Sequence, residues 1–423
     1  MNVLLLGSGG REHAIAWKLK QSPELSELYI APGNAGTSTC GTNVKIDTTD
    51  FNEIKNFCIK NNIEMVIVGP EDPLVNGIHD FFLQDSLLKK INVIGPTKQG
   101  AKLEGSKEFA KIFMERHSIP TAKYKSFTKE NLHEGFDFLD NLNAPYVLKA
   151  DGLAAGKGVL IINDINEAKK ELETMICTEK FGEASTKVVI EEFLDGIEMS
   201  VFVLTDGEKY VILPNAKDYK RIGENDTGLN TGGMGCISPV PFADNIFLSK
   251  VENQIIKPTI NGLNKDSIKY RGFIFFGLIK VNNNPFVIEY NIRMGDPETE
   301  VVMPRLKSDL LQLFKASINK TLDQMDVEFE KKNVATIILA SGGYPLSYEK
   351  GKKITGLNNI NKSLVFHAGT KETNFIETNG GRVLAVTGFG NNLLEATQCA
   401  YADIKKINFQ GMYYRTDIGK DVF

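Results

Sequence analysis

The chain has 423 residues, which is enough for roughly three domains with cores of their own. Its 49 basic and 53 acidic side chains give a net charge of −4 without any block of like charge, so no nucleic-acid partner and no membrane surface is predicted. Five widely spaced cysteines form no metal-ligand pattern, and no apolar stretch is long enough to span a bilayer. These features predict a reduced, cytoplasmic protein.

The first hundred residues repeat one unit, a short apolar strand followed by a glycine turn and an amphipathic helix. The strands are expected at Val3–Leu6, Leu28–Ala31, Met65–Val68 and Val93–Ile94. This alternation predicts an α/β fold with an open parallel sheet and helices on both faces. Ligands of such folds bind at the carboxyl ends of the strands, so the turns there are candidate site loops.

The first of these turns contains Gly9, Gly10, Arg11 and Glu12. It resembles a dinucleotide fingerprint, but Glu12 stands where the third glycine is needed for helix packing, which disfavours a nicotinamide cofactor. Free backbone amides at a helix start beside Arg11 would make a cradle for a monophosphate. A tight turn with a solvated Arg11 is an equally good interpretation of this segment alone.

Residues 145–162 place Lys149 and Lys157 around a glycine loop, Gly152–Gly158, with an apolar strand on each side. The loop is not a Walker A motif, because only three residues separate Gly152 from Gly156 and Gly158 replaces the hydroxyl residue. Glycines allow backbone amides to approach phosphate closely, and lysines supply positive charge. The segment is either a strand–loop–strand lid for a polyphosphate or a glycine-rich hairpin with surface lysines.

The pattern between these segments and the carboxyl-terminal region alternates between helix and strand. Helices are expected at about 107–117, 130–141 and 165–177, and strands near 124–127 and 188–192. The last strand runs into Glu191, Phe193 and Leu194, which could form an adenine hinge, with Glu198 near the ribose. A strand end with solvated acids is the alternative. From about residue 331, alternating strands and turns predict a mainly β domain.

A candidate metal site lies in the strand expected at 286–293. Alternation places Glu289, Asn291 and Arg293 on one face. A carboxylate and an amide oxygen suit Mg²⁺ with water and phosphate as its other ligands, and an arginine could grip a carboxylate. The polar face of an exposed strand is the alternative, which the acid-rich turn at 294–300 weakens.

A second glycine-rich stretch, 226–235, shows no apolar periodicity. It contains Asn230, Thr231, Gly232 and Gly233, and it is either a substrate loop or an ordinary flexible surface loop.

In this order the motifs resemble those of the ATP-grasp carboxylate–amine ligases and, among them, the phosphoribosylamine–glycine ligase family. The similarity extends over nearly the whole chain, at residues 7–14, 31–36, 68–74, 103–107, 149–159, 230–235, 295–299 and 366–370. It implies an ATP-grasp fold with three parts, an N-terminal parallel α/β domain (1–105), an ATP-grasp domain (106–330, with a lid at about 121–190) and a C-terminal mainly β domain (331–423).

The resemblance also implies a reaction. ATP, glycine and 5-phosphoribosylamine would give glycinamide ribonucleotide, ADP and phosphate through glycyl phosphate, as a step of de novo purine biosynthesis. The cofactors would be ATP and Mg²⁺ or Mn²⁺, and transient contact with neighbouring purine-pathway enzymes is expected.

Site residues carried over from the resemblance fall into four groups. The ATP site would comprise Lys107, Lys149, Gly156, Lys157, Gly158, Glu191, Phe193, Leu194 and Glu198. The metal ligands would be Glu289 and Asn291. The substrates would be bound by Gly9, Gly10, Arg11, Glu12, Glu71, Asp72, Asn230, Thr231, Gly232, Gly233, Arg293, Gly295 and Asp296. The catalytic residues would be Arg293, Lys149 and Asp218, with Arg293 orienting the glycine carboxylate.

The chain departs from the family pattern at a few positions. Lys217 and Tyr219 flank Asp218 where glutamine and histidine are expected, and Met294 replaces a phenylalanine. The strand expected at 273–281 lacks the acid that other ATP-grasp enzymes carry, which leaves two protein ligands for the metal. A ligase for another carboxylate and amine, or a nucleotide-binding regulatory protein without catalysis, would share the fold.

Overall fold

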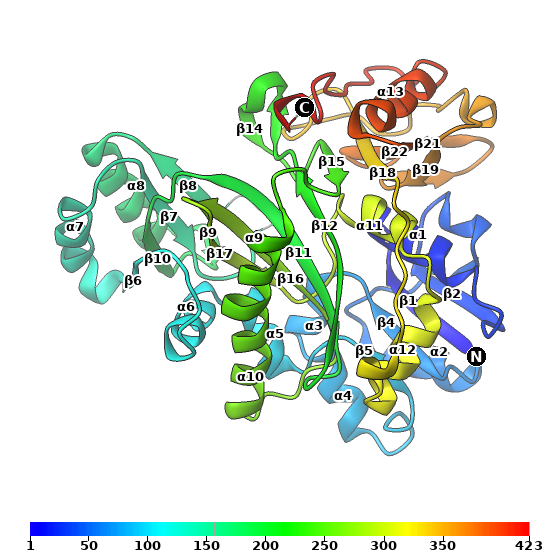
Figure 1. Cartoon of the computed structure of the whole chain (residues 1–423), viewed down its shortest axis with the longest axis horizontal. Helices are drawn as coiled ribbons and strands as arrows, with labels where there is room; N and C mark the ends of the chain where they lie inside the picture. Colours follow the sequence, from blue (N-terminus) through cyan, green and yellow to red (C-terminus); the bar gives the residue numbers. More distant parts are fainter. Residues whose placement is uncertain (155–157, 423) are drawn as a thin grey trace.

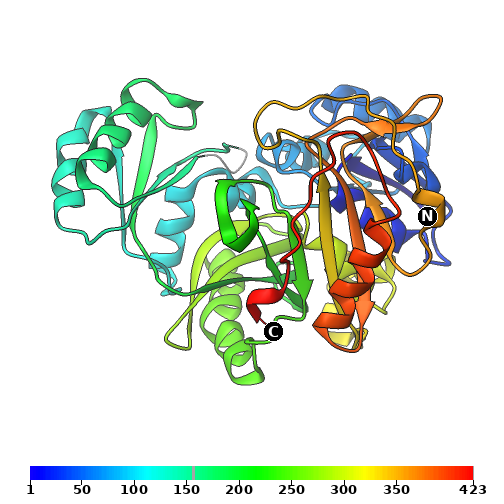
Figure 2. The ribbon, with the colours of Figure 1, turned by 90° about the horizontal axis from the view of Figure 1, so that it is seen from above.

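The structure is a computed structural model that describes residues 1–154 and 158–422, and it contains three main sheets (Figure 1). A five-stranded sheet is built from the amino-terminal residues, a four-stranded sheet from residues 124–192, and an eight-stranded sheet from most of the remainder. The four-stranded sheet stands apart from the other two in both views (Figures 1 and 2).

The five-stranded sheet has the order β3-β2-β1-β4-β5, and all of its strand pairs are parallel. Its strands are β1 (Asn2–Gly7), β2 (Glu27–Pro32), β3 (Thr42–Asn43), β4 (Met65–Val68) and β5 (Asn92–Ile94). Its helices are α1 (Gly10–Leu19), α2 (Phe51–Lys60), α3 (Glu71–Val75), α4 (Ile78–Gln84) and α5 (Lys98–Gly105), with a 3₁₀ turn at Thr37–Thr39. The open parallel α/β prediction is confirmed.

Both faces of this sheet are buried, as is usual for parallel sheets. Leu4 and Leu6 pack into one hydrophobic cluster with Val66, whereas Val3 and Leu5 face a second cluster that includes residues of α1. The carboxyl ends of the strands are therefore the exposed edge at which polar loops can gather.

The four-stranded sheet has the order β6-β10-β7-β8 and is packed against two helices. Its elements are β6 (Tyr124–Thr128), α7 (Leu132–Asp140), β7 (Tyr146–Ala150), β8 (Val159–Ile162), α8 (Ile165–Cys177) and β10 (Lys187–Glu192), with β9 (Lys180–Glu183) and a 3₁₀ turn at Lys129–Asn131 beside them. Strands β7 and β8 pair antiparallel, with Lys149 opposite Val159, so the strand–loop–strand arrangement is present. Gly156 and Lys157 lie outside the described residues.

The eight-stranded sheet has the order β17-β16-β11-β12-β15-β18-β22-β19. Its strands are β11 (Ile197–Thr205), β12 (Tyr210–Asp218), β15 (Gly235–Ser238), β16 (Gly272–Val281), β17 (Asn284–Asn291), β18 (Asn333–Ala340), β19 (Leu364–His367) and β22 (Arg382–Gly390). The mainly β carboxyl-terminal region continues this eight-stranded sheet, which we call the central sheet, because β18 pairs antiparallel with β15.

Helices and hairpins complete the fold around this sheet. The helices are α6 (Lys107–Arg116), α9 (Asn245–Val251), the π-helix η4 (Glu252–Ile256), α10 (Lys257–Lys265), α11 (Thr299–Arg305), α12 (Leu310–Asn319) and α13 (Leu393–Ile404). The hairpins are β13 (Arg221–Gly223) with β14 (Thr227–Asn230), and β20 (Thr370–Glu372) with β21 (Ile376–Thr378). Short 3₁₀ turns lie at Glu224–Asp226, Leu322–Gln324, Leu357–Asn359 and Lys420–Val422. No helix within residues 1–154 and 158–422 has the length and apolar composition needed to cross a bilayer.

Candidate active site

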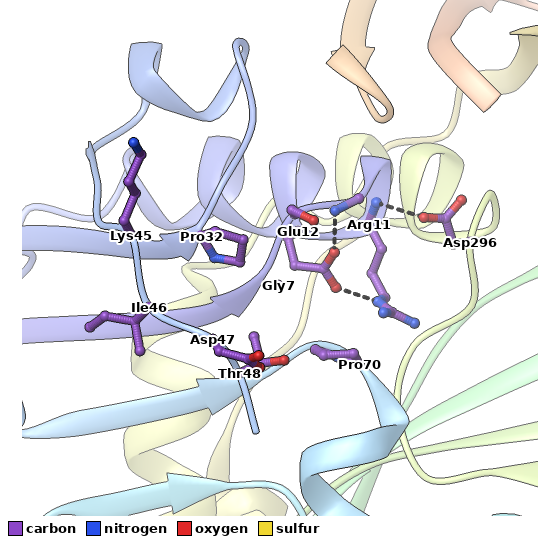
Figure 3. Close-up of a pocket in the computed structure, with 12 residues that line it drawn as sticks. Gly7, Arg11, Glu12, Pro32, Lys45, Ile46, Asp47, Thr48, Pro70 and Asp296 are labelled. Carbon is purple, nitrogen blue, oxygen red and sulfur yellow. Dashed lines mark hydrogen bonds and ion pairs between the residues drawn. The ribbon is translucent and has the colours of Figure 1, made fainter. Parts of the chain in front are cut away.

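A pocket of about 590 Å³ opens at the carboxyl ends of β1, β2 and β4 (Figure 3). It is lined by Gly7, Ser8, Gly9, Arg11, Glu12, Pro32, Lys45, Ile46, Asp47, Thr48, Pro70 and Asp296. Asp296 comes from the turn before α11 and is the one lining residue that lies outside the first 70 residues. The pocket therefore joins the amino-terminal sheet to the acid-rich turn at 294–300.

Glu12 organises the turn at the base of this pocket. Its carboxylate accepts hydrogen bonds from the Gly9 amide at 2.6 Å and from Arg11 Nε at 2.5 Å, and the side chain is 1% exposed (Figure 3). The carboxylate stands so close to Gly7 and Gly69 that a Cβ at either position would collide with it. The acid in place of a third glycine thus holds the turn and aims Arg11.

Two guanidinium groups meet beyond this turn. Arg293 Nε lies 3.0 Å from Glu71 Oε2, and Arg293 Nη2 lies 2.7 Å from Glu104 Oε1. The carbonyl of Met294 accepts a hydrogen bond from both Arg293 and Arg11, each at 3.3 Å. Burial raises the pKa of Glu104 to about 7, and Arg293 opposes this shift. Sequence analysis missed Glu104, although it lies inside the motif at 103–107.

Asp296 connects the helix α1 terminus to the carboxyl-terminal region. Its Oδ2 accepts a hydrogen bond from the Arg11 amide at 3.3 Å, and its Oδ1 lies 2.9 Å from Arg382 Nη2. Arg382 Nη1 also donates to the carbonyl of Gly232 at 2.8 Å. The glycine-rich loop and the acid-rich turn at 294–300 therefore meet at Arg382, a residue that was not predicted from the sequence.

The loop at 231–233 is held by several hydrogen bonds. Thr231 donates to the Lys220 carbonyl at 2.8 Å through both its amide and its hydroxyl, and the hydroxyl accepts from the Gly233 amide at 2.9 Å. The Gly232 amide donates to the Tyr344 hydroxyl at 3.0 Å. Gly233 has φ +117°, a backbone conformation that residues with a side chain rarely adopt. A Cβ at this position would also collide with Pro297. Asn230 is exposed at the end of β14.

The predicted phosphate lysines, Lys149 and Lys107, both lie close to the loop that follows β7. Lys149, on β7, is 5% exposed, and its Nζ lies 2.9 Å from Glu191 Oε1 at an angle poor for a hydrogen bond. Lys107 is the first residue of α6, and its Nζ donates to the Gly152 carbonyl at 3.2 Å. The Asp151 carboxylate accepts from the Glu108 amide at 2.7 Å, so the same loop caps α6. Both lysines are thereby placed beside the lid strands.

Lys111 is a further lysine of this cluster that sequence analysis missed. It is 2% exposed, and its Nζ lies 2.9 Å from Glu191 Oε2 and donates to Thr121 Oγ1 at 2.8 Å. Burial lowers the pKa of Lys111 to about 8. Its position four residues after Lys107 on one helix face could have indicated it.

The predicted hinge joins the four-stranded sheet to the eight-stranded one, since β10 ends at Glu192 and β11 begins at Ile197. Phe193 is exposed and Leu194 is half-buried, as an apolar ligand surface would be. The Glu191 carboxylate instead lies between two lysines. Glu198 is exposed, and its Oε2 lies 3.2 Å from Lys220 Nζ.

Glu289 and Asn291 lie on one face of β17, because they pair with Gly277 and Phe275, which are two residues apart on β16. Burial alone would raise the pKa of Glu289, but Lys220, Lys149 and Lys107 lower it below its usual value. An ionised carboxylate and an amide oxygen are ligands of the kind that Mg²⁺ or Mn²⁺ prefers, and Lys107 and Lys149 lie beside them. Among the described residues, no group of three or more His, Cys, Asp or Glu side chains has metal-site geometry.

Two more acids lie on the same side of the sheet. Asp218 ends β12, and its pKa is raised by burial first and then by Glu198 and Glu289, against the charge of Lys220. Glu298 is 4% exposed, and burial together with Asp218 raises its pKa to about 8. Its Oε1 lies 3.5 Å from Ser200 Oγ. Glu298 is another residue that sequence analysis missed.

The remaining predicted residues are placed as follows. Asp72 is exposed at the start of α3, Gly10 packs against the Glu300 carboxylate, Gly295 packs against Glu298, and Gly158 packs against Ala150 and Ala154. The structure thus brings together Lys107, Lys149, Glu289, Asn291, Asp218 and Arg293. It places Arg11, Glu12 and Asp296 around a separate pocket next to them.

Three family models match the chain. They are the N domain of phosphoribosylglycinamide synthetase over residues 1–104, its ATP-grasp (A) domain over residues 105–299, and its C domain over residues 334–421.

Individual relatives match over the full length. The phosphoribosylamine–glycine ligase of Vibrio vulnificus is 46% identical over 99% of this chain and 98% of its own length. A bifunctional purine biosynthetic protein of Pichia angusta is 44% identical over 100% of this chain, which spans 54% of that protein. The crystal structure of phosphoribosylamine–glycine ligase from Thermotoga maritima is 37% identical, with a TM-score of 0.86 and coverage of 99% of this chain and 100% of that one.

Proposed function

This chain belongs to the phosphoribosylglycinamide synthetase family and is a ligase of glycine and 5-phosphoribosylamine that splits ATP to ADP and phosphate; we propose glycyl phosphate as its intermediate. The observation that carries this proposal is the convergence of Lys107, Lys149 and Lys220 on the Glu289 carboxylate. Such a site neutralises and orients phosphate and needs no covalent nucleophile.

The two steps balance as displacements. An oxygen of the glycine carboxylate attacks the γ-phosphorus, and the bond between that phosphorus and the ADP oxygen breaks. The amine of 5-phosphoribosylamine then attacks the acyl carbon, inorganic phosphate leaves with the carboxylate oxygen, and the nitrogen loses a proton. Asp218, with its raised pKa, is suited to accept that proton.

We assign the binding roles from the same geometry. Lys107 and Lys149 would hold the ATP phosphates, and Arg293, held by two carboxylates, would orient the glycine carboxylate. Glu289 and Asn291 would hold Mg²⁺ or Mn²⁺, which when bound neutralises phosphate charge. The pocket around Arg11 and Glu12 would take 5-phosphoribosylamine, because it offers both cations for phosphate and carboxylates for hydroxyl and amine groups.

The domain boundaries, the partners and the cellular location are part of the same proposal. Division into residues 1–105, 106–330 and 331–423 is supported by the three separate family models. Transient contact with neighbouring purine-pathway enzymes is supported by the bifunctional relative from Pichia angusta. Five free cysteines favour the reducing cytoplasm.

An isotope experiment tests the intermediate. Glycine labelled with oxygen-18 in its carboxylate should pass one label per turnover to inorganic phosphate, which mass spectrometry detects. The control is unlabelled glycine in oxygen-18 water, in which phosphate should stay unlabelled. Unlabelled phosphate from labelled glycine would exclude glycyl phosphate.

A further inference from the structure

The two family departures, Lys217 at the end of β12 and Tyr219 just after it, point away from the active site. Side chains alternate along a strand, so Lys217 and Tyr219 share one side while Asp218 and Lys220 share the other. Lys217 Nζ lies 3.0 Å from Asp421 Oδ2, and the Tyr219 hydroxyl donates to Asp421 Oδ1 at 2.6 Å. One carboxylate near the carboxyl terminus therefore holds both departures.

The two side chains that contact Asp421, Lys217 and Tyr219, are buried. Tyr219 is 2% exposed, and the Lys217 ammonium stands 3.8 Å from the centre of its ring. Arg415 lies 5.4 Å from the same ring and is 1% exposed. Tyr219 thus lies near two cations that are attracted to its ring. Lys217 is paired with Asp421, and Arg415 is paired with Asp226 and Asp417.

The same terminal segment also holds the β13–β14 hairpin that follows Lys220 (Figure 1 shows the carboxyl terminus beside β14). Arg415 Nη1 lies 2.6 Å from Asp226 Oδ1, and the Asp417 carboxylate accepts from the Asn225 amide at 2.7 Å. The terminal residues are therefore attached both before and after the segment 218–220.

The opposite side of this segment faces the proposed nucleotide site. Lys220 Nζ lies 3.2 Å from Glu198, which the sequence predicts near the ribose, and the charge of Lys220 lowers the pKa of Glu289. Lys217, Asp218, Tyr219 and Lys220 are consecutive, so a shift of the anchored side chains moves the active-site pair with them. Displacement of a binding group by about 1 Å can cost up to 10²-fold in rate.

We propose that Asp421 is a positioning residue of the active site, which acts through Lys217 and Tyr219 to hold Asp218 and Lys220 against the nucleotide site. This inference rests on the proposed function, because that function assigns the roles of Asp218 and Glu289. Asp421 itself touches no substrate in this proposal. Its contacts with Lys217 and Tyr219 fix the position of the end of β12.

The test uses the full chain with Asp421→Asn, which keeps the shape of the side chain and removes its charge. Titration calorimetry with Mg²⁺ and a non-hydrolysable ATP analogue should show affinity about tenfold weaker than wild type, and the Michaelis constant for ATP should rise with it. Asp421→Glu should restore most of the affinity, because the side chain is 45% exposed and a longer acid has room. Lys420→Ala, an exposed neighbour, is the matched control and should bind as wild type.

A double-mutant cycle distinguishes positioning from a general loss of stability. If Asp421 acts through Lys217, Lys217→Met combined with Asp421→Asn should weaken analogue binding no further than Lys217→Met alone. Additive losses would overturn the proposal, as would wild-type affinity in Asp421→Asn. Should Asp421→Asn fail to fold, Tyr219→Phe removes the hydroxyl alone and must also weaken binding.

The readouts separate this inference from the proposed function. Absence of glycine-dependent ADP release by the wild-type protein would refute the function. Analogue binding would still decide whether Asp421 positions the strand end, because it requires no turnover.

Discussion

Glu289 is the residue at which the metal hypothesis is most directly testable. Glu289→Gln keeps the shape and removes the charge that faces Lys107, Lys149 and Lys220, so Mg²⁺ should bind more weakly. We expect kcat/KM for ATP to fall by about 10²- to 10³-fold. Steady-state kinetics across Mg²⁺ concentrations provides the measurement, and added Mg²⁺ should recover part of the loss.

The stability of this variant is the control. Its melting temperature should fall, because the lowered pKa of Glu289 means that the ionised carboxylate stabilises the folded state, and a neutral amide leaves three lysines without that partner. Turnover is therefore compared at a temperature at which both proteins are folded. A variant with wild-type turnover at limiting Mg²⁺ would remove Glu289 from the metal site.

Sequence periodicity predicted part of this geometry and missed the rest. Alternation placed Glu289 and Asn291 on one face, and the register of β17 with β16 agrees. The same alternation predicted that the strand continues to Arg293 and that Arg293 shares its face. In the structure β17 ends at Asn291, and the Arg293 side chain pairs with Glu71 and Glu104. Such pairings join residues about 200 positions apart, and a local pattern carries no information on them.

Helix α6 carries two lysines, Lys107 and Lys111, on the side that faces the lid strands. Glu191 lies between Lys111 and Lys149 at 2.9 Å from each, and all three side chains are almost fully buried. Lys111 therefore shares the charge of Glu191 and leaves part of the Lys149 charge available to phosphate.

This arrangement makes a specific prediction. In Lys111→Met, Lys149 would be the remaining lysine paired with Glu191, so Glu191 would neutralise more of the Lys149 charge. Less positive charge would be available to the ATP phosphates, and the Michaelis constant for ATP should rise about tenfold. Stability should also fall, by up to about 3–5 kcal/mol, because a buried ion pair loses one partner. ATP kinetics and urea unfolding provide the two measurements.

Lys170→Met, at an exposed position of α8, is the matched control and should change neither quantity. Unchanged ATP kinetics in a folded Lys111→Met protein would show that Lys149 does not depend on its neighbour.

Element types were largely predictable because each carries a local pattern. Helix α8 begins after Asp164, whose side chain accepts from the Glu167 amide, and the expected range 165–177 is observed. The continuation of the central sheet into the carboxyl-terminal region was not predicted. It depends on β15 pairing with β18, and strand pairing across a long separation is set by tertiary packing.

The amino- and carboxyl-terminal regions of the molecule meet directly beside the pocket around Arg11 and Glu12. The Asn34 side chain donates to the His367 carbonyl at 2.7 Å, and the His367 amide donates to His13 Nδ1 at 2.8 Å. Burial lowers the pKa of His13 to about 3, so this imidazole stays neutral and can accept. The pocket is thus fixed by contacts between regions at opposite ends of the chain.

Glu300 lies at the same junction. It is 0% exposed on α11, and neither carboxylate oxygen has a hydrogen-bond partner among the described residues. It packs so closely on Gly10 of α1 that a Cβ there would stand 2.2 Å from Oε1, and its carbonyl accepts from Thr387 of β22 at 3.2 Å. Burial raises the pKa of Glu300 well above its usual value, so the folded protein favours the protonated acid.

The pH dependence of stability follows from this shift. A glutamate in the unfolded chain has a pKa of about 4.3. The raised pKa of Glu300 in the folded protein therefore contributes its full stability below that pH, and this contribution is lost as the pH rises through the pKa of the folded state. Glu300→Gln stays neutral at every pH. It should therefore unfold much like wild type near pH 5 and gain about 1–3 kcal/mol relative to wild type by pH 8.

Chemical denaturation of both proteins from pH 5 to pH 8 measures this difference. Glu173→Gln makes the same chemical change at an exposed position of α8 and should show no growing difference across the range. A Glu300→Gln protein whose advantage stays constant with pH would mean that Glu300 is ionised in the folded state, with a cation or water at the junction of α1, α11 and β22 that satisfies it.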